Sequence, residues 1–177
     1  MNSGKIAFCC AYICDSPDLD VDVISGRYGL ALTQQWGATL LALDAYIRHD
    51  DRRCTNPNAL VFGEAIIAVD HGAAFAGMSQ PGMTGRALAM RTVIQSSLHE
   101  HVFFSAVRKW YDKIDWNGVR DRLRRIGRPQ IAAAASWWPE ELEPHRTHVV
   151  EFLLERQAHV DTIVENVAEL TKPRSKA

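Results

Sequence analysis

The sequence lacks long apolar runs, an excess of either charge, internal repeats and low-complexity segments. No stretch approaches the ~18 consecutive apolar residues of a membrane-spanning helix, so we expect a soluble protein that does not enter membranes. The net charge of −1 provides no general attraction to nucleic acid, and direct binding to nucleic acid is not expected.

The sequence contains four cysteines, and their spacing does not indicate a metal-binding site. Cys9, Cys10, Cys14 and Cys54 form no C-x-x-C pair and no cluster at zinc-finger spacing. Such cysteines are typical of free thiols in a reducing compartment, which predicts a cytoplasmic protein. The 47% hydrophobic content of the 177 residues suffices for one domain over 1–177 with a real core.

A short hairpin is predicted in the middle of the chain. Two apolar, β-favouring runs, 59–62 and 65–69, are separated by Gly63-Glu64. A two-residue turn with glycine first favours a type II′ hairpin. The hairpin returns the chain on itself, so residues before the first strand and after the second should meet at one edge.

Three polar residues flank this hairpin. Asn56 precedes the first strand, Asp70 follows the second, and Asp51 lies five residues before Asn56. Oxygen ligands from Asn56 and Asp70 at one edge suit Mg²⁺, while Asp51 could accept or orient the proton of an attacking hydroxyl. Protein-kinase-like sites contain these parts in this order, which predicts phosphoryl transfer.

The segment 43–75, LDAYIRHDDRRCTNPNALVFGEAIIAVDHGAAF, resembles the catalytic segment of HipA-like kinases. Members of that family read approximately F-D-x-W-I-x-N-x-D-R, then N-P-N-L-L, then I-D-H-G-x-A-F. Later, W-W-P-E-E-L followed by F-L-L-E-R is similar to the family's helical tail, so the resemblance covers roughly residues 6 to 165. It implies an ATP-dependent kinase with two lobes, often phosphorylating Ser or Thr of a protein partner and often part of a toxin–antitoxin pair.

The resemblance also implies roles for single residues. Asp51 matches the catalytic Asp, Asn56 the metal-binding Asn and Asp70 the metal-binding Asp, with ATP and Mg²⁺ as cofactors. The apolar run 6–14 matches the strand that leads into the hinge between the lobes. Tyr12, within that hinge, is expected to contact ATP at the adenine edge.

The sequence departs from the family ahead of the catalytic segment. A complete kinase of this kind has a small lobe with a phosphate loop and a nucleotide-binding Lys, whereas Lys5 is the only Lys here before Asp51. We therefore expect a hinge, 1–14, joined to a large lobe that transfers phosphate when a small lobe is supplied elsewhere. A small-lobe protein or an antitoxin is the expected partner. The alternative is a catalytically incomplete kinase lobe that binds a partner or a nucleotide.

The expected fold class is α+β and mostly helical, as in the large C-terminal lobe of a protein kinase with a short catalytic hairpin. Before the hairpin, 34–48 predicts a helix with Trp36, Leu40, Leu43 and Ile47 on one face. Four glycines in 72–86 predict a mobile loop. Further helices are expected at 86–95, 97–111, 117–126, 129–136 and 144–170, before a frayed tail, 171–177.

Other polar clusters are given structural interpretations. Five arginines between 120 and 128 are expected on a solvated helix face, because no aromatic residues are interleaved with them. His99 with His101, and His145 with His148, are expected on helix surfaces rather than at a metal, and Trp137-Trp138 is expected to anchor the core.

A metal-dependent phosphohydrolase is a second enzyme class to consider, with His49-Asp50 as its central ligand pair. That scheme requires an additional upstream His, and none precedes residue 49 in this sequence. The kinase interpretation is therefore preferred.

Overall fold

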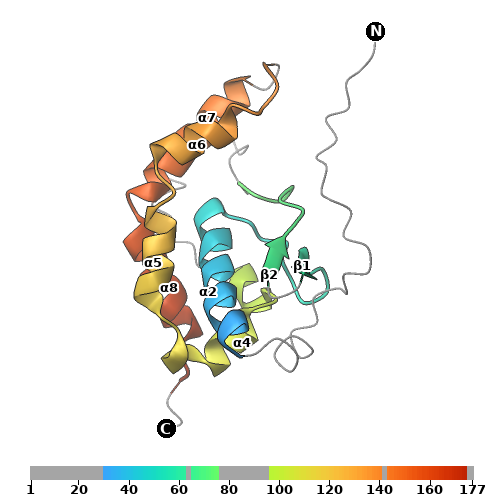
Figure 1. The fold of residues 1–177 in the computed structure, drawn as a ribbon, viewed down its shortest axis with the longest axis vertical. Coiled ribbons are helices and arrows are strands. Elements are labelled where there is room, and N and C mark those ends of the chain that lie inside the picture. The colour runs from blue at the N-terminus through green and yellow to red at the C-terminus, as the bar shows by residue number, and fades with distance from the viewer. Residues whose placement is uncertain (1–29, 63–64, 76–95, 141–142, 175–177) are drawn as a thin grey trace.

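The long helix α2, Leu30–Ile47, lies at the centre of the fold (Figure 1). The protein is represented by a computed structural model that describes residues 30–62, 65–75, 96–140 and 143–174. Helices α4, Phe104–Lys109, α5, Trp116–Arg124, and α8, Val160–Thr171, pack against α2. The mostly helical α+β class is thereby confirmed.

The core forms where these helices meet. Its fully buried members include Leu41 on α2, Val107 on α4, Leu123 on α5 and Val164 on α8. Gly37 allows the close approach of α2 to Phe103, because a Cβ atom at Gly37 would lie 3.0 Å from the Phe103 ring. A larger side chain at residue 37 would push these two parts of the core apart.

The predicted helical face of α2 is only partly correct. Leu40 is buried and Leu43 and Ile47 are half-buried, but Trp36 is 44% exposed and has the Arg122 guanidinium over its ring. The small residues of α2, Ala38, Ala42 and Ala45, are buried as well. Since other elements cover α2 on several sides, its apolar surface is wider than a single stripe.

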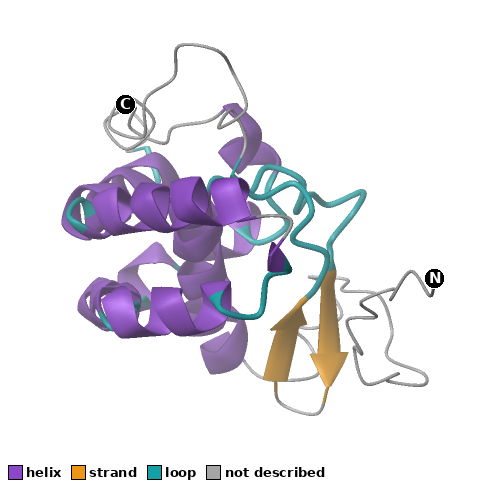
Figure 2. Cartoon of the chain, turned by 90° about the horizontal axis from the view of Figure 1, so that it is seen from above, coloured by secondary structure: helices purple, strands orange, loops and turns teal. Residues whose placement is uncertain are grey.

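The hairpin forms at the predicted place. Strands β1, Ala59–Phe62, and β2, Ala65–Ala68, pair antiparallel with Ala59 opposite Ala68 and Phe62 opposite Ala65. Ile66 and Ala68 pack against the helical core, so the hairpin lies at the side of α2 (Figures 1 and 2). The turn residues 63–64 lie outside the described residues.

The predicted continuous helix 97–111 is wrong. A 3₁₀ helix, Ser96–Glu100, precedes α4, and a second, Tyr111–Lys113, follows it. Between the first 3₁₀ helix and α4, the amide of Val102 donates to the Arg52 carbonyl at 3.0 Å and His101 forms a β-bridge with Arg53. Pairing with a distant segment therefore interrupts the helix.

The predicted single helix 144–170 is also wrong, because it is divided between α7, Glu143–Gln157, and α8. At the break, the amides of Ala158 and His159 bond to carbonyls three residues earlier. The Gln157 amide group donates to the Arg124 carbonyl at 2.9 Å, which ties the break to the end of α5. Thr171, the first residue of the predicted tail, ends α8 and is buried.

The expected core role of Trp137 is wrong, since this side chain is 85% exposed. Helix α6, Arg128–Ala135, packs on α7, and among its side chains only Ile131 is buried. Trp137 lies in the turn directly after α6, where the Trp138 amide bonds to the Ala135 carbonyl. The pair of α6 and α7 lies at the periphery of the fold (Figure 1), where little core is within reach.

None of the helices that the structure describes has both the length and the apolar character needed to cross a lipid bilayer. The hinge 1–14 with Tyr12, the helix 86–95 and most of the loop 72–86 lie outside the described residues.

Candidate functional site

The C-terminal end of α2 begins the candidate site. Arg48 adopts a left-handed conformation with φ 55°. The amide of His49 donates to the Asp44 carbonyl at 2.8 Å and that of Arg48 to the Ala45 carbonyl at 3.4 Å. This pair of bonds is a Schellman motif, which usually has glycine at the left-handed position. The helix therefore ends abruptly and directs the chain into the loop that contains Asp51.

A buried arginine from α7 stabilises the same helix end. The Arg156 guanidinium donates to the carbonyls of Tyr46, at 2.8 Å, and Ala45, at 2.6 Å. A cation at these carbonyls also complements the negative end of the helix dipole. Burial, followed by repulsion from Arg48, lowers the pKa of Arg156 to about 10. Arg156 stays charged at neutral pH and holds the helix end in place.

Beneath the site lies a buried polar cluster of Asp44, Arg52 and His101. The Arg52 Nε atom donates to Asp44 Oδ2 at 2.6 Å, and His101 Nε2 donates to the same oxygen at 2.9 Å. All three residues are at most 4% exposed. The His101 Nδ1 atom accepts a bond from the Phe103 amide at 3.2 Å, so His101 is the neutral imidazole with its proton on Nε2.

Burial and hydrogen bonding shift two pKa values in this cluster. Burial alone would raise the pKa of Asp44, but the bonds from His101 and Arg52 outweigh it and lower that pKa below its ordinary 3.8. Burial lowers the pKa of His101 below its ordinary 6.5, although the bond to Asp44 opposes this effect. The folded protein therefore favours charged Asp44 beside neutral His101.

These shifts predict that acid weakens the fold in two steps. Below about pH 6.5, His101 becomes protonated in the unfolded state but stays neutral in the folded state, because its folded pKa is lower. The free energy of unfolding therefore falls as the pH falls. The contribution of Asp44 is present above about pH 3.8 and is lost as the pH falls through its lowered folded pKa.

Urea denaturation at several pH values between about 5 and 7.5 measures the first step. His101→Gln should reduce the pH slope in this range. A smaller slope should remain, because burial also lowers the pKa of His71. Equal slopes for both proteins would contradict the assignment to His101.

The loop after α2 joins Asp51 to two asparagines. Asn56 Nδ2 donates to Asp51 Oδ2 at 2.9 Å, and Asn58 Nδ2 lies 3.4 Å from the same oxygen. The sequence predicted that Asp51 and Asn56 face a common space, and the structure brings these two side chains into direct contact. Because the amide nitrogen of Asn56 is used as a donor, its Oδ1 atom is oriented away from Asp51 as an acceptor.

The end of β2 returns to this loop. The amide of Val69 donates to the Asn58 carbonyl at 2.9 Å, immediately before Asp70. The Asp70 carbonyl accepts a bond from buried His49 Nε2 at 3.0 Å, and Asp70 Oδ1 accepts the Gly72 amide at 3.2 Å. Asp70 is exposed, so its carboxylate is accessible to a ligand.

Unusual backbone conformations gather in this segment. In the described part of the chain, non-glycine residues with positive φ are Arg48 at 55°, Asn58 at 45°, Asp70 at 50° and Phe75 at 63°. The cost is about 1–2 kcal/mol for residues such as Arg48 and Phe75 and smaller for Asn58 and Asp70, because short polar side chains tolerate this region. All four lie between 48 and 75, and strained conformations of this kind occur preferentially at functional sites.

The sequence interpretation missed Asp44, Arg52 and His101 as a unit. His99 is exposed as expected, but the surface position expected for His101 is wrong, because His101 is buried on Asp44. Two signals were available in the sequence. Asp44 is a charged residue inside a mostly apolar helix, and Arg52, a possible partner of opposite charge, lies eight residues after it. Their partnership with His101, 57 residues from Asp44, had no local signal.

The phosphohydrolase alternative finds no support in this geometry. His49 is buried and its Nε2 atom is engaged by the Asp70 carbonyl. Over the described residues, no three or more His, Cys, Asp or Glu side chains come together in a group that could hold a metal ion. A pair of Asn56 and Asp70 is a different arrangement, and its binding of Mg²⁺ remains a prediction.

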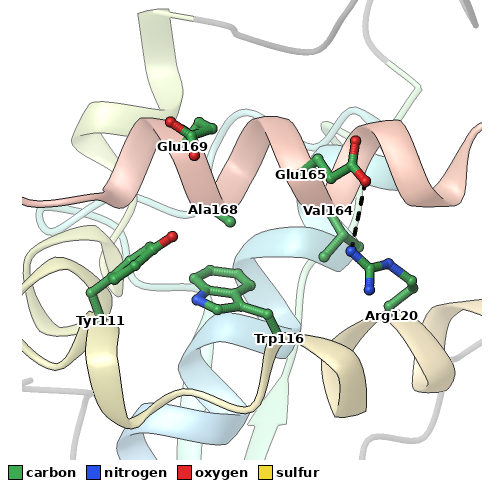
Figure 3. A pocket seen from close by; sticks show the side chains of 7 residues that line it. All are labelled: Tyr111, Trp116, Arg120, Val164, Glu165, Ala168 and Glu169. Carbon is green, nitrogen blue, oxygen red and sulfur yellow. Dashed lines mark ion pairs between the residues drawn. The ribbon is translucent and has the colours of Figure 1, made fainter.

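A pocket of about 350 Å³ lies elsewhere, between α5, α8 and the 3₁₀ helix Tyr111–Lys113 (Figure 3). Arg120 and Glu165 form an ion pair at 3.8 Å in its wall. Arg124 pairs with Asp161 on α8 at 2.7 Å, so the basic run is neutralised in part within the protein. No lining residue belongs to 43–75, and the pocket is separate from the candidate site.

Comparisons with protein-family models, with curated proteins and with solved structures found no match to this chain. The HipA-like resemblance therefore remains a prediction that depends on the residues of the 43–75 segment.

Proposed function

We propose that the protein, together with a small lobe supplied elsewhere, transfers the γ-phosphoryl group of ATP to a Ser or Thr hydroxyl of a protein partner. The observation that carries this proposal is the hydrogen bond of 2.9 Å between Asn56 and Asp51, in a loop bonded to the residue before Asp70. An Asp, an Asn at i+5 and a second Asp across a hairpin are the polar groups that kinase-type phosphoryl transfer uses.

Asp51 is the proposed group that receives the substrate hydroxyl. Donation from Asn56 and Asn58 to Oδ2 orients the carboxylate, while the structure gives Oδ1 no such donor among the described residues. A carboxylate held in this way can position the hydroxyl and accept its proton as the new P–O bond forms. Positioning contributes much of the catalysis in phosphoryl transfer, because the protein does little covalent chemistry itself.

Asn56 and Asp70 are the proposed ligands for Mg²⁺. Asn56 Oδ1 and the second carboxylate oxygen of Asp70 are hard donors, and the nitrogen of Asn56 is already occupied by Asp51. This donor set fits Mg²⁺, which binds few protein oxygens and keeps several waters. When bound, the ion would neutralise charge on the ATP phosphates.

Metal binding can be tested without an acceptor substrate. Mn²⁺, measured by electron paramagnetic resonance, should bind in the presence of ATP and be displaced by Mg²⁺. Asp70→Asn should weaken binding by at least the roughly 10–100-fold that loss of an outer-shell partner costs, because it removes a ligand itself. Asp112→Asn, an exposed change outside the site, is the matched control.

Phosphoryl transfer is then measured with γ-labelled ATP and a panel of Ser- and Thr-containing proteins, including the chain itself. Label that requires Mg²⁺ and appears on Ser or Thr would support the kinase. Nucleotide-dependent Mn²⁺ binding without any label transfer, even after a small-lobe protein with a phosphate loop and Lys is added, would overturn it in favour of a nucleotide-binding module. Equal Mn²⁺ affinity of the Asp70→Asn protein would contradict the metal assignment.

Two arginines next to Asp51 already have acidic partners in the structure. Arg52 is buried on Asp44, and Arg53 pairs with Glu100 at 3.2 Å. We therefore expect these 177 residues by themselves to bind ATP weakly, and a small lobe that supplies a phosphate loop and Lys should strengthen binding.

A further inference from the structure

The Arg52 side chain connects three parts of the candidate site. Its Nε and Nη2 atoms face the Asp44 carboxylate on α2, at 2.6 and 3.4 Å. Its Nη1 atom donates to the Asn58 carbonyl before β1 and lies 3.4 Å from the Val69 carbonyl after β2. One planar group therefore contacts α2, the residue before β1 and the residue after β2, so it joins the helix to the open end of the hairpin.

We propose that Arg52, oriented by Asp44 and His101, is a positioning residue that sets the spacing between Asp51 and Asp70. Asp51 immediately precedes Arg52, and Asp70 immediately follows Val69. A shift of the guanidinium would thus move the hairpin end relative to the loop that presents Asp51. The role in catalysis rests on the proposed kinase function, whereas the role in holding the hairpin does not.

The backbone and the partners of Arg52 restrict its movement. The Arg52 carbonyl accepts the Val102 amide at 3.0 Å, so the residue is held at its main chain as well. His101 Nε2 shares Asp44 Oδ2 with the guanidinium, and the Phe103 amide fixes the His101 ring through Nδ1. Asp44 therefore cannot rotate without breaking bonds to both residues.

The contacts require the shape of arginine as well as its charge. The guanidinium group is planar and rigid. One of its edges can donate to a carboxylate while the remaining nitrogen donates to carbonyl oxygens. A lysine ammonium keeps the charge beside Asp44 but is a single point with a different reach. Arg52→Lys should consequently retain the ion pair and lose the simultaneous contact with Asn58 and Val69.

Amide hydrogen exchange tests this role without any enzyme assay. The reporter is the Val69 amide, bonded to the Asn58 carbonyl, and the reference is the Ile163 amide in α8, bonded to the His159 carbonyl. In Arg52→Lys, exchange at Val69 should become at least about tenfold faster relative to Ile163, as expected for local opening without global unfolding. His101→Gln, a milder change, should shift the ratio in the same direction and provides the test if Arg52→Lys does not fold.

Arg156→Lys is the matched control, because Arg156 is equally buried and donates to carbonyls at the end of α2. It should alter exchange at Val69 and Ile163 to similar extents. A Val69 to Ile163 ratio that stays unchanged in both Arg52→Lys and His101→Gln would overturn the proposal. So would an equal change in the ratio for Arg156→Lys, since it would show only general destabilisation.

Enzyme kinetics distinguish the positioning role of Arg52 from the proposed phosphoryl transfer. If the wild-type protein transfers phosphate, Arg52→Lys should lower kcat at least about tenfold with little change in KM for ATP, since a misplaced group acts mainly on the chemical step. An unchanged kcat alongside faster Val69 exchange would overturn the catalytic part of the proposal. No transfer by the wild-type protein, even with a small-lobe protein added, would instead contradict the proposed function, while the exchange ratio still decides whether Arg52 holds the hairpin.

Discussion

Asp51→Asn is expected to lower the rate of phosphoryl transfer by roughly 10²–10⁴-fold, the usual contribution of a general base or hydroxyl-positioning group. The substituted amide can still present an oxygen to Asn56 and Asn58, whose Nδ2 atoms contact Asp51 Oδ2 in the structure. The loop should therefore keep its conformation. What is lost is the negative charge that attracts the substrate proton.

The measurement compares the transfer of γ-labelled phosphate by the two proteins at saturating ATP, together with their denaturation midpoints. Asp112→Asn makes the same chemical change at an exposed residue of the 3₁₀ helix Tyr111–Lys113 and should retain full transfer. An Asp51→Asn protein that folds and keeps wild-type transfer would show that another group positions the hydroxyl. Parallel losses of transfer and stability would assign a structural role to Asp51.

Asp44→Asn is expected to lower the free energy of unfolding by about 3–5 kcal/mol, because it leaves the charge of Arg52 buried without its partner. Both side chains of this pair are fully buried, and their closest atoms lie 2.6 Å apart. His101 also donates to the oxygen that Arg52 contacts. The asparagine oxygen can still accept from both groups, but the residue cannot neutralise the guanidinium, and its amide nitrogen would face Arg52 Nη2, which contacts Asp44 Oδ1 in the structure.

Urea denaturation with a constant m-value would measure this loss. Asp121→Asn is a matched control, because Asp121 pairs with Arg124 at 3.6 Å while both side chains are more than half exposed. Solvent screens that pair, so its removal should have little effect. Equal effects of the two substitutions would contradict the importance of burial for the Asp44–Arg52 pair.

The hairpin could be predicted because its signals are local. An apolar run, a two-residue turn with glycine first and a second apolar run follow one another, and this order specifies both strands. The observed strands begin at the predicted residues, Ala59 and Ala65. The contact between Asp51 and Asn56 follows from the same locality, since Asn56 lies only five positions after Asp51 in one loop. Magnesium and ATP binding at this edge remain predictions.

Helix boundaries in the second half were less predictable. Helical periodicity continues through 97–111 and 144–170, but neither segment is one helix. In the first, Val102 bonds to the Arg52 carbonyl, and in the second, Gln157 bonds to the end of α5. These partners lie far away in the sequence, so no local pattern indicates where the helix must stop.

The sequence by itself determined the mostly helical α+β class, the hairpin and the local order of Asp51, Asn56 and Asp70, because short-range periodicity and turn chemistry encode them. Only the tertiary structure decided that Asp44, Arg52 and His101 form a buried cluster beneath that segment. The physical reason is desolvation: a buried charge is tolerated only with a partner, and that partner can come from anywhere in the chain. Here it comes from α2 and from the segment before α4, which meet only once the core has formed.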